Sequence, residues 1–511
     1  MTSAVIIGAG LSGIASAARL AKAGFEVKVF EKAGTPGGRA ALIQREGFRF
    51  DTGPTLFLMP EVFAETFSAL GEKMEDHLDL VRLDPTYRVH FHDGSILDLT
   101  SNLVEMREQL DVLEPGSFEA YLRFMAEGYR HYNLSLQKFV GRNFYSIFEF
   151  FSLRNLPLLF QLKALRKHAS NTSKFFTDPR LQAAFSFQNM YLGLSPYDAP
   201  ATFSLLQYTE LADGVWFPKG GLYKVIDSLE QISKGLGVKY YYNSAVEKII
   251  IDGNKASGIV LENGEIIKAD LVVACADLPY VYGSLLPDDG TYHKLLGKKY
   301  TSSALMFYWG VKGNKSTKLL HHNVFLADHR YKDSFDSIFK EHTLPDEPSF
   351  YINVPSRTDP TFAPPDGDGV MALVPVGHLD PERHQDWRDM ENKARETIWK
   401  RLSYMGLEDI SNRLVFEESW GPPYYRNELN LEKGSAFGLS HNFKQIGYFR
   451  PHNRHAFYKN LYFAGASTHP GTGLPIVLLS AKLTVGRILK EGIVPEKKIQ
   501  LSQVRAAGSV R

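Results

Sequence analysis

The chain has a single cysteine, Cys275, among its 511 residues. One thiol excludes an intrachain disulfide, and it also excludes a zinc or iron–sulfur site built from several thiolates. Cys275 stands in the apolar run LVVACA at 271–276, so we expect it to be a small buried residue in a strand. The sequence shows no Ser/His/Asp pattern and no metal-ligand spacing, and it therefore predicts no metal site.

An excess of one charge and long apolar runs are also missing. The formal net charge is +1, which argues against a nucleic-acid partner held by bulk electrostatics. No uncharged apolar stretch approaches the roughly twenty residues that a membrane-spanning helix needs. Residues 4–20 are apolar, but no basic residue precedes them, and the chain ends in a polar tail at 501–511. We expect neither a signal peptide nor a transmembrane helix.

Residues 4–24 predict a strand, a glycine-rich turn and a helix, because the apolar run AVIIG is followed by GAGLSG and then by small residues. The glycines match the pattern GxGxxG. Gly8 permits the tight turn, Gly10 lets a pyrophosphate approach the backbone, and Gly13 lets the helix pack on the strand. The helix N-terminus adds N–H donors for phosphate. This pattern predicts a dinucleotide site at the start of the chain.

An acid and a second pair of glycines distinguish between nicotinamide and flavin. Glu31 follows the second expected strand (26–30), where a carboxylate binds ribose hydroxyls and disfavours the 2′-phosphate of NADP. The run TPGGR at 35–39 comes next, and FDTGPT follows at 50–55. This pairing resembles the amine-oxidase-like FAD superfamily, in which the glycines and the arginine meet the pyrophosphate and the DTGP-like segment approaches the flavin. A guanidinium suits that place because its fork matches two phosphate oxygens.

The C-terminal part of the sequence also predicts a strand, a loop and a helix in succession. Residues 461–464 predict a strand, a loop rich in glycine and proline follows, and a helix begins near Pro475. Such a helix start points amide groups at an acceptor, for example the flavin ring carbonyls or the ribityl chain. Another strand–loop–helix unit packed on the sheet is the alternative, but it does not account for the density of glycines.

Between these ends the pattern changes from helical to alternating. Residues 100–213 predict mainly helices, and the most apolar part, 144–168, is interrupted by Pro157, so it forms two short helices or a helix and a loop. Alternating segments and turns are then expected at 238–251, 252–254, 256–268, 263–264 and 270–275.

Several long segments resemble the phytoene-desaturase-type carotenoid desaturases, with 185–210 most similar to the fungal branch. The matching segments are 215–225 (VWFPKGGLYKV), 430–454 and 460–473 (NLYFAGASTHPGTG). The resemblance implies an α/β fold: a Rossmann-like FAD-binding domain with an interleaved mixed α+β substrate domain. The expected FAD domain is discontinuous, at 1–85, 215–285 and 440–500. The substrate domain is expected at 86–214 and 286–439, and the tail at 501–511.

The motifs and the resemblance together give a set of candidate FAD contacts. Ser467 is included because related flavoenzymes usually place an acid in this region, at the ribityl chain, whereas this sequence has Ala466 and Ser467. Val246 matches a position where related flavoproteins touch the adenine. The candidate residues are Gly8, Gly10, Leu11, Ser12, Gly13, Glu31, Lys32, Gly38, Arg39, Pro54, Thr55, Val246, Gly465, Ser467, Leu474, Pro475 and Ile476.

The resemblance implies desaturation of a long apolar isoprenoid, a C40 or C30 carotenoid precursor such as phytoene. The flavin takes a hydride and a proton is lost. His469 lies in the expected flavin loop as a candidate for proton transfer, although a histidine there is more often a structural hydrogen-bonding group. Oxygen or a quinone is the expected electron acceptor. A flavin amine or protoporphyrinogen-type oxidase is the alternative enzyme, and a flavin-free isoprenoid-binding chaperone is the alternative from another class.

Residues 144–168 combine aromatic bulk with basic side chains, a mixture that interfacial segments use. The basic residues are Arg154, Lys163, Arg166 and Lys167. We expect a peripheral membrane protein that faces the cytoplasm; a pair of buried core helices is the competing interpretation.

Overall fold

The computed structural model describes residues 2–153, 155–313 and 315–493, so the expected polar tail at 501–511 lies outside it. A parallel five-stranded sheet forms the first layer. Its strands, in spatial order, are β19 (Leu461–Phe463), β13 (Leu271–Ala274), β1 (Ser3–Ile7), β2 (Glu26–Phe30) and β9 (Lys239–Tyr241). Ile6 lies opposite Val29 on one side and Val273 on the other. Continuous apolar runs suit these central strands because both faces of the sheet are covered.

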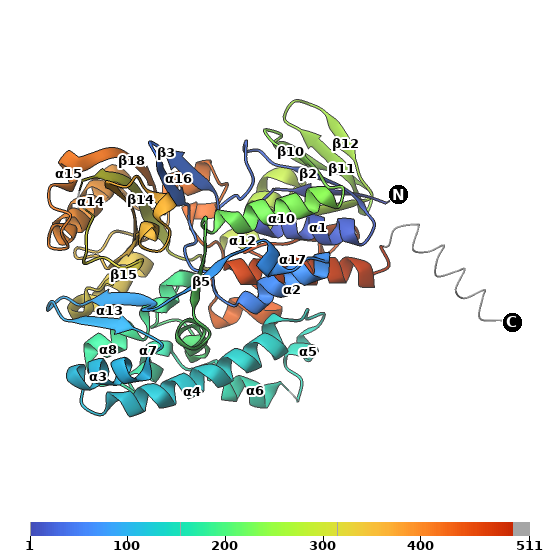
Figure 1. The fold of residues 1–511 in the computed structure, drawn as a ribbon. Coiled ribbons are helices and arrows are strands. Elements are labelled where there is room, and N and C mark those ends of the chain that lie inside the picture. Colours follow the sequence, from blue (N-terminus) through green and yellow to red (C-terminus); the bar gives the residue numbers. More distant parts are fainter. Residues whose placement is uncertain (1, 154, 314, 494–511) are drawn as a thin grey trace.

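Four helices lie together on one side of this sheet (Figure 1). They are α1 (Leu11–Lys22), α2 (Pro60–Leu70), α10 (Tyr223–Gly235) and α17 (Leu474–Lys490). Helix α1 contacts the other three, and Ile14 shares one core cluster with Val225 and Leu478. The small residues Ala15 and Ala18 lie in the same cluster, and they let these helices come close together.

An antiparallel three-stranded sheet follows β9, made of β10 (Val246–Asp252), β11 (Lys255–Leu261) and β12 (Ile266–Lys268). Both predicted turns are present, with Gly253 and Gly264 at positive φ. The expected continuous segment 238–251 is wrong, because β9 and β10 belong to different sheets. Asn243 has φ +50, and this left-handed residue redirects the chain between the two strands.

The largest sheet is mixed and has seven strands. In spatial order they are β18 (Leu414–Trp420), β14 (Ser303–Lys312), β17 (Gly367–Val376), β16 (Phe350–Asn353), β15 (His322–Phe325), β6 (Tyr87–His90) and β7 (Ile96–Leu99). Strands β15 and β6 pair in parallel, with Val324 opposite Val89. The sheet therefore joins two stretches of chain that are more than 200 residues apart.

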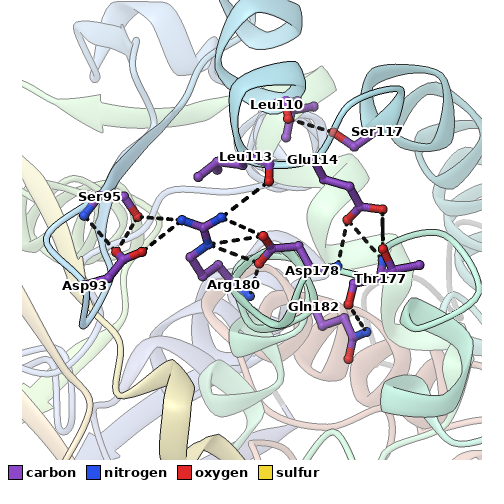
Figure 2. A network of polar contacts seen from close by, with 10 residues as sticks. All are labelled: Asp93, Ser95, Leu110, Leu113, Glu114, Ser117, Thr177, Asp178, Arg180 and Gln182. Atoms are coloured by element: carbon purple, nitrogen blue, oxygen red, sulfur yellow. Dashed lines mark hydrogen bonds and ion pairs between the residues drawn. The ribbon is translucent and has the colours of Figure 1, made fainter.

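A helical layer occupies residues 103–208, as predicted (Figure 1). Its helices are α3 (Leu103–Leu113), α4 (Ser117–Ser135), α5 (Ile147–Phe150), α6 (Leu156–Gln161), α7 (His168–Thr172), α8 (Pro179–Ala184) and α9 (Leu205–Tyr208). Figure 2 shows how Arg180 holds this layer to the large sheet. Its guanidinium pairs with Asp178 at 2.6 Å and with Asp93 at 2.9 Å, and it donates to the Leu113 carbonyl at 3.3 Å.

The predicted α/β fold class is confirmed, with parallel strands under helices and a separate mixed sheet. Two short ribbons, β3 (Leu42–Arg45) with β4 (Phe48–Asp51) and β5 (Leu80–Leu83) with β8 (Val215–Pro218), complete the sheets. The further α-helices are α11 (Leu278–Tyr280), α12 (Thr291–Leu296), α13 (Tyr331–Asp336), α14 (Trp387–Ser403), α15 (Ile410–Arg413) and α16 (Pro422–Asn427). Within the described ranges, every helix is too short or too polar to cross a membrane.

Candidate functional site

The first glycine turn lies between β1 and α1. Gly8 has φ +98, and its N–H donates to the Phe30 carbonyl at 2.8 Å. A Cβ on Gly13 would lie 2.0 Å from the Gly8 carbonyl oxygen, so a larger residue at this position would push α1 away from the turn. This backbone requirement agrees with the role that the pattern predicts for Gly13.

The second glycine turn packs on the first. The Gly37 N–H donates to the Ala9 carbonyl at 2.9 Å, and a Cβ on Gly38 would lie 3.5 Å from the Gly10 Cα. Around Gly10 itself there is more room, because the nearest heavy atom to a Cβ there is 4.0 Å away. Gly10 thus presents bare backbone beside the first turn of α1, whose N–H groups have no partner within the helix.

Glu31 connects the glycine turn to the end of β2. Its carboxylate accepts hydrogen bonds from the backbone N–H groups of Ala9 at 2.7 Å and Ala33 at 2.9 Å. The side chain is half-buried, whereas the neighbouring Lys32 is exposed. The acid is therefore fixed at the edge of the turn, where the sequence places the ribose.

The C-terminal loop, residues 465–473, meets the N-terminal helix. A Cβ on Gly465 would lie 3.4 Å from the Ser12 hydroxyl, and the Gly465 N–H donates to Ser480 at 3.1 Å. The loop ends in the first turn of α17, which contains Leu474, Pro475 and Ile476. Residues 465 and 12 are in contact distance although they come from opposite ends of the chain, so both ends contribute to one site.

Asp277 is a half-buried acid in this site that sequence reasoning missed. It follows β13, and its carboxylate accepts a hydrogen bond from the Ser467 hydroxyl and another from the Glu432 N–H at 3.2 Å. Burial raises the pKa of Asp277, and the nearby Arg39 lowers it. The Arg39 guanidinium also donates to the Ala436 carbonyl at 3.1 Å. Asp277 thus places a carboxylate beside Ser467, in the region where related flavoenzymes usually have an acid.

Arg450 holds the C-terminal loop in place, and sequence reasoning also missed this residue. The side chain is 1 % exposed. Its guanidinium donates to the carbonyls of Thr468 at 3.0 Å and Ser440 at 3.1 Å, and to that of Ala466. Burial lowers its pKa to about 9, so it remains a cation at neutral pH. It lies within the segment 430–454 that carries the resemblance, but a single arginine in a loop has no sequence signal of its own.

His469 is held by the backbone rather than exposed to solvent. Nε2 lies 2.7 Å from the Arg142 carbonyl oxygen, and the side chain is 5 % exposed. Burial lowers its pKa to about 4, so the imidazole is neutral at pH 7. Its Nε2–H then donates the hydrogen bond that the Arg142 backbone carbonyl accepts. This geometry favours the structural role; proton transfer by His469 remains untested.

Three other predicted contacts lie at the borders of the site. Thr55 follows the DTGP segment, and its Oγ1 lies 2.9 Å from the Tyr351 hydroxyl on β16; Pro54 precedes it and is half-buried. Val246 is 7 % exposed and lies opposite Leu261 at the start of β10. Thr55 therefore connects the FAD domain to the large sheet, while the adenine contact of Val246 stays a prediction.

Cys275 follows the last residue of β13 rather than lying within the strand, a difference of one position. Burial raises the pKa of its thiol to about 12, in keeping with an inert residue. The absence of a metal site stays a prediction. His92, His329 and Glu347 each offer a donor atom within 4.8 Å of the others, but all three are exposed, and exposed groups gather in this way without an ion.

The residues present fit FAD. Gly10 leaves bare backbone for a diphosphate, the start of α1 offers N–H donors, and Arg39 supplies a cation beside them. Glu31 supplies an acceptor for ribose hydroxyls. The Asp277–Ser467 pair and the C-terminal loop are then free to contact the ribityl chain and the flavin ring, two parts that a nicotinamide dinucleotide does not have.

Comparison with known proteins agrees with a flavin cofactor. The family model described as flavin containing amine oxidoreductase matches residues 11–489. The chain is 48 % identical over 487 residues to a zeta-carotene-forming phytoene desaturase of Myxococcus xanthus, covering 95 % of this chain and 93 % of that protein. It is 44 % identical to a phytoene desaturase of Neurospora crassa, covering 97 % and 86 %. The solved structure of an oxidoreductase from Methanosarcina mazei has a similar fold, with a TM-score of 0.62, 20 % identity and coverage of 94 % and 99 %.

Proposed function

Because the chain belongs to the flavin containing amine oxidoreductase family, we propose that it introduces C=C bonds into phytoene or a similar C40 precursor. It is an FAD-dependent oxidoreductase of carotenoid desaturation. The observation that carries the substrate proposal is the 48 % identity, over 95 % of the chain, to a zeta-carotene-forming phytoene desaturase.

Desaturation removes a hydride and a proton from adjacent carbons, and bound FAD supplies the hydride acceptor. The chain holds the cofactor with Gly10, Glu31 and Arg39 at its dinucleotide part and with the C-terminal loop at its flavin part. The protein then orients the hydrocarbon and excludes water, which are the contributions that an unactivated substrate needs.

The direct test uses phytoene in liposomes with FAD-loaded protein, first in air and then without oxygen but with an added quinone. New conjugated chromophores, resolved by chromatography, are the expected result, and the condition that yields them identifies the acceptor. The Gly10→Val variant is the matched control. No product in either condition contradicts the proposal.

The alternative enzyme is an amine or protoporphyrinogen-type oxidase on the same fold. Peroxide release on addition of an amine or a porphyrinogen, with no product from phytoene, would favour it. A chaperone without flavin is contradicted by the membership of the chain in a family of FAD-dependent oxidoreductases.

We also propose that the segment 144–168 docks on a membrane surface, where phytoene and a quinone both dissolve. Support comes from the exposure of its large apolar side chains: Phe148 84 %, Leu153 89 %, Phe160 77 % and Leu165 75 %. Helices α5 and α6 carry or border them at the outer edge of the helical layer (Figure 1). A small cluster of its own, with Phe139, Phe144, Phe150 and Leu162, supports the segment from inside.

The cations of this segment are distributed unevenly. The Lys163 ammonium pairs with the buried Glu127 and so points inward, which removes it from the set expected to meet lipid. Arg166 and Lys167 are exposed, although the Lys167 ammonium pairs with the exposed Asp198 at 3.2 Å, and Arg154 lies outside the described residues. In the proposed peripheral association on the cytoplasmic face, the exposed apolar side chains contribute most of the binding and these two cations contribute less.

A further inference from the structure

Glu210 is a carboxylic acid enclosed in the substrate domain. It lies in η5 (Thr209–Asp213), a single π-helical turn that continues α9, and such turns are frequent at functional sites. The side chain has 0 % exposure. Burial raises its pKa well above 4.5, and the polar side chains of Gln188, Tyr87 and Tyr191 offset only part of that increase.

A line of buried polar groups connects Glu210 to the FAD domain. The Tyr87 hydroxyl donates a long hydrogen bond of 3.5 Å to Glu210 Oε1, and the Tyr87 ring lies 5.4 Å from the His322 ring. His322 Nδ1 is 2.5 Å from the Tyr351 hydroxyl, which is 2.9 Å from Thr55 Oγ1. The line therefore ends beside the DTGP segment, which approaches the flavin in related flavoproteins.

Several buried polar atoms on or near this line have no protein partner. They are Glu210 Oε2, Gln207 Oε1, and Nε2 of His321 and His322. A buried polar atom without a partner costs free energy, so native cores contain few of them. Their occurrence on the acid and along its line indicates a place where function, rather than stability, has selected the residues.

We propose that Glu210 accepts the proton that desaturation removes from the substrate. The inference rests on the proposed function and deepens it. One C–H bond breaks and its electron pair leaves as a hydride to the flavin. On the adjacent carbon, a C–H bond gives its proton to the line of polar side chains, which delivers it to the Glu210 carboxylate, and the electron pair of that bond forms the C=C bond. The flavin is then reoxidised by oxygen or a quinone, and Glu210 releases its proton to solvent.

The surroundings make the ionised form of Glu210 a strong base. The titratable groups that face it and its line are Tyr87, Tyr191, His321, His322 and Tyr351. None is a cation at neutral pH, because burial holds the pKa of His322 well below 6.5 and lowers that of His321 to about 3. A buried carboxylate with no cation beside it gains more from taking a proton than one in water does.

The test is the anaerobic reduction of the bound flavin by phytoene in liposomes, followed by flavin absorbance in single turnovers across pH. For the wild type we expect the rate to rise with pH through an apparent pKa above 4.5. Glu210→Gln should lose that rise and slow flavin reduction on the order of 100-fold or more. Glu210→Asp keeps a carboxyl group and should retain the rise at a lower rate.

Tyr87→Phe gives a readout that a purely structural role does not predict. Because the Tyr87 hydroxyl lowers the pKa of Glu210, its removal should move the rising limb to higher pH. Tyr331→Phe is the matched control, since Tyr331 packs on the same core cluster but bonds Ser186 instead. FAD content and melting temperature are measured for each variant.

Two results overturn the proposal, and they are distinguishable. If Glu210→Gln reduces its flavin at the wild-type rate with the same pH profile, Glu210 is not the proton acceptor while desaturation stands. If phytoene fails to reduce the flavin of the wild type at any pH, desaturation itself fails and this inference with it. Should Glu210→Gln not fold, an unshifted limb in Tyr87→Phe contradicts the proposal on its own.

Discussion

The hydroxyl of Ser467 donates a hydrogen bond to the carboxylate of Asp277, a residue 190 positions earlier in the chain. The pair joins the end of β13 to the C-terminal loop, and Arg39 lies close enough to lower the pKa of Asp277. A single half-buried carboxyl group thus connects the loop expected at the flavin with the cation expected at the pyrophosphate.

Asp277→Asn and Ser467→Ala should each weaken FAD binding, by about tenfold for the loss of roughly 1.4 kcal/mol of buried hydrogen bonding. Quenching of FAD fluorescence by the apoprotein measures the dissociation constant. Asp252→Asn, at the exposed β10–β11 turn, is the control and should bind as the wild type does. Unchanged affinity in both test variants would remove Asp277 from the flavin site.

Substitution of Gly10 and substitution of Gly13 in the first turn should have different effects. Gly10→Val should fold but not bind FAD, because a Cβ there has room in the protein and blocks only the close approach of the diphosphate. Gly13→Val should lower the melting temperature of the apoprotein, since its Cβ would lie 2.0 Å from the Gly8 carbonyl oxygen. Equal melting temperatures for the two variants would contradict this assignment.

Buried neutral histidines should make the fold sensitive to acid. Burial lowers the pKa of His90, His168, His378 and His469 to about 4 and that of His321 to about 3. Their ordinary pKa is near 6.5, so between pH 6.5 and 4 the unfolded chain binds more protons than the folded one. The free energy of unfolding therefore decreases as the pH is lowered through this range, by up to about 1.4 kcal/mol per pH unit for each group.

We expect cooperative unfolding within that range, monitored by near-ultraviolet circular dichroism. His168→Met removes one of these buried proton sites and should shift the midpoint to lower pH. His384→Met, at an exposed position, should leave it in place. A midpoint below pH 4 for the wild type would show that these histidines do not control acid unfolding.

Phe148→Ser combined with Phe160→Ser should reduce liposome binding several-fold without changing the fold, because both side chains are largely exposed and bury little in the protein. Val112→Ser, on α3 and 84 % exposed, is the matched control. Sedimentation with vesicles measures the bound fraction. Charge reversal at Arg166 and Lys167 tests the electrostatic share. Binding unaffected by all of these changes would exclude docking through this segment.

The sequence was most informative where function depends on the backbone. Gly8, Gly13 and Gly465 could be recognised because positive φ or close packing leaves few alternatives to glycine. Such constraints are local, and they appear in the sequence as fixed spacings. The confirmed fold class and cofactor follow from them together with the family resemblance.

Asp277, Arg450 and Glu210 were missed for the opposite reason. Each acts through partners that are distant in sequence: Ser467 for Asp277, backbone carbonyls for Arg450 and Tyr87 for Glu210. Nothing in the neighbouring residues distinguishes them from ordinary surface acids or loop arginines. The redirection of the chain at Asn243 escaped prediction similarly, because strand periodicity continues across it.

The order of strands in the parallel sheet also has a consequence for the newly made chain. β1 and β2 leave the ribosome first, but β19 begins at Leu461, and residues 31–460 are translated in between. At roughly 5–20 residues per second, this interval lasts roughly 20 to 90 s. During that time the nascent glycine turn lacks the C-terminal loop and β13 lacks its β19 neighbour. We therefore expect the cofactor to bind late in synthesis, and a chain released before Leu461 to bind FAD poorly because it lacks the C-terminal loop.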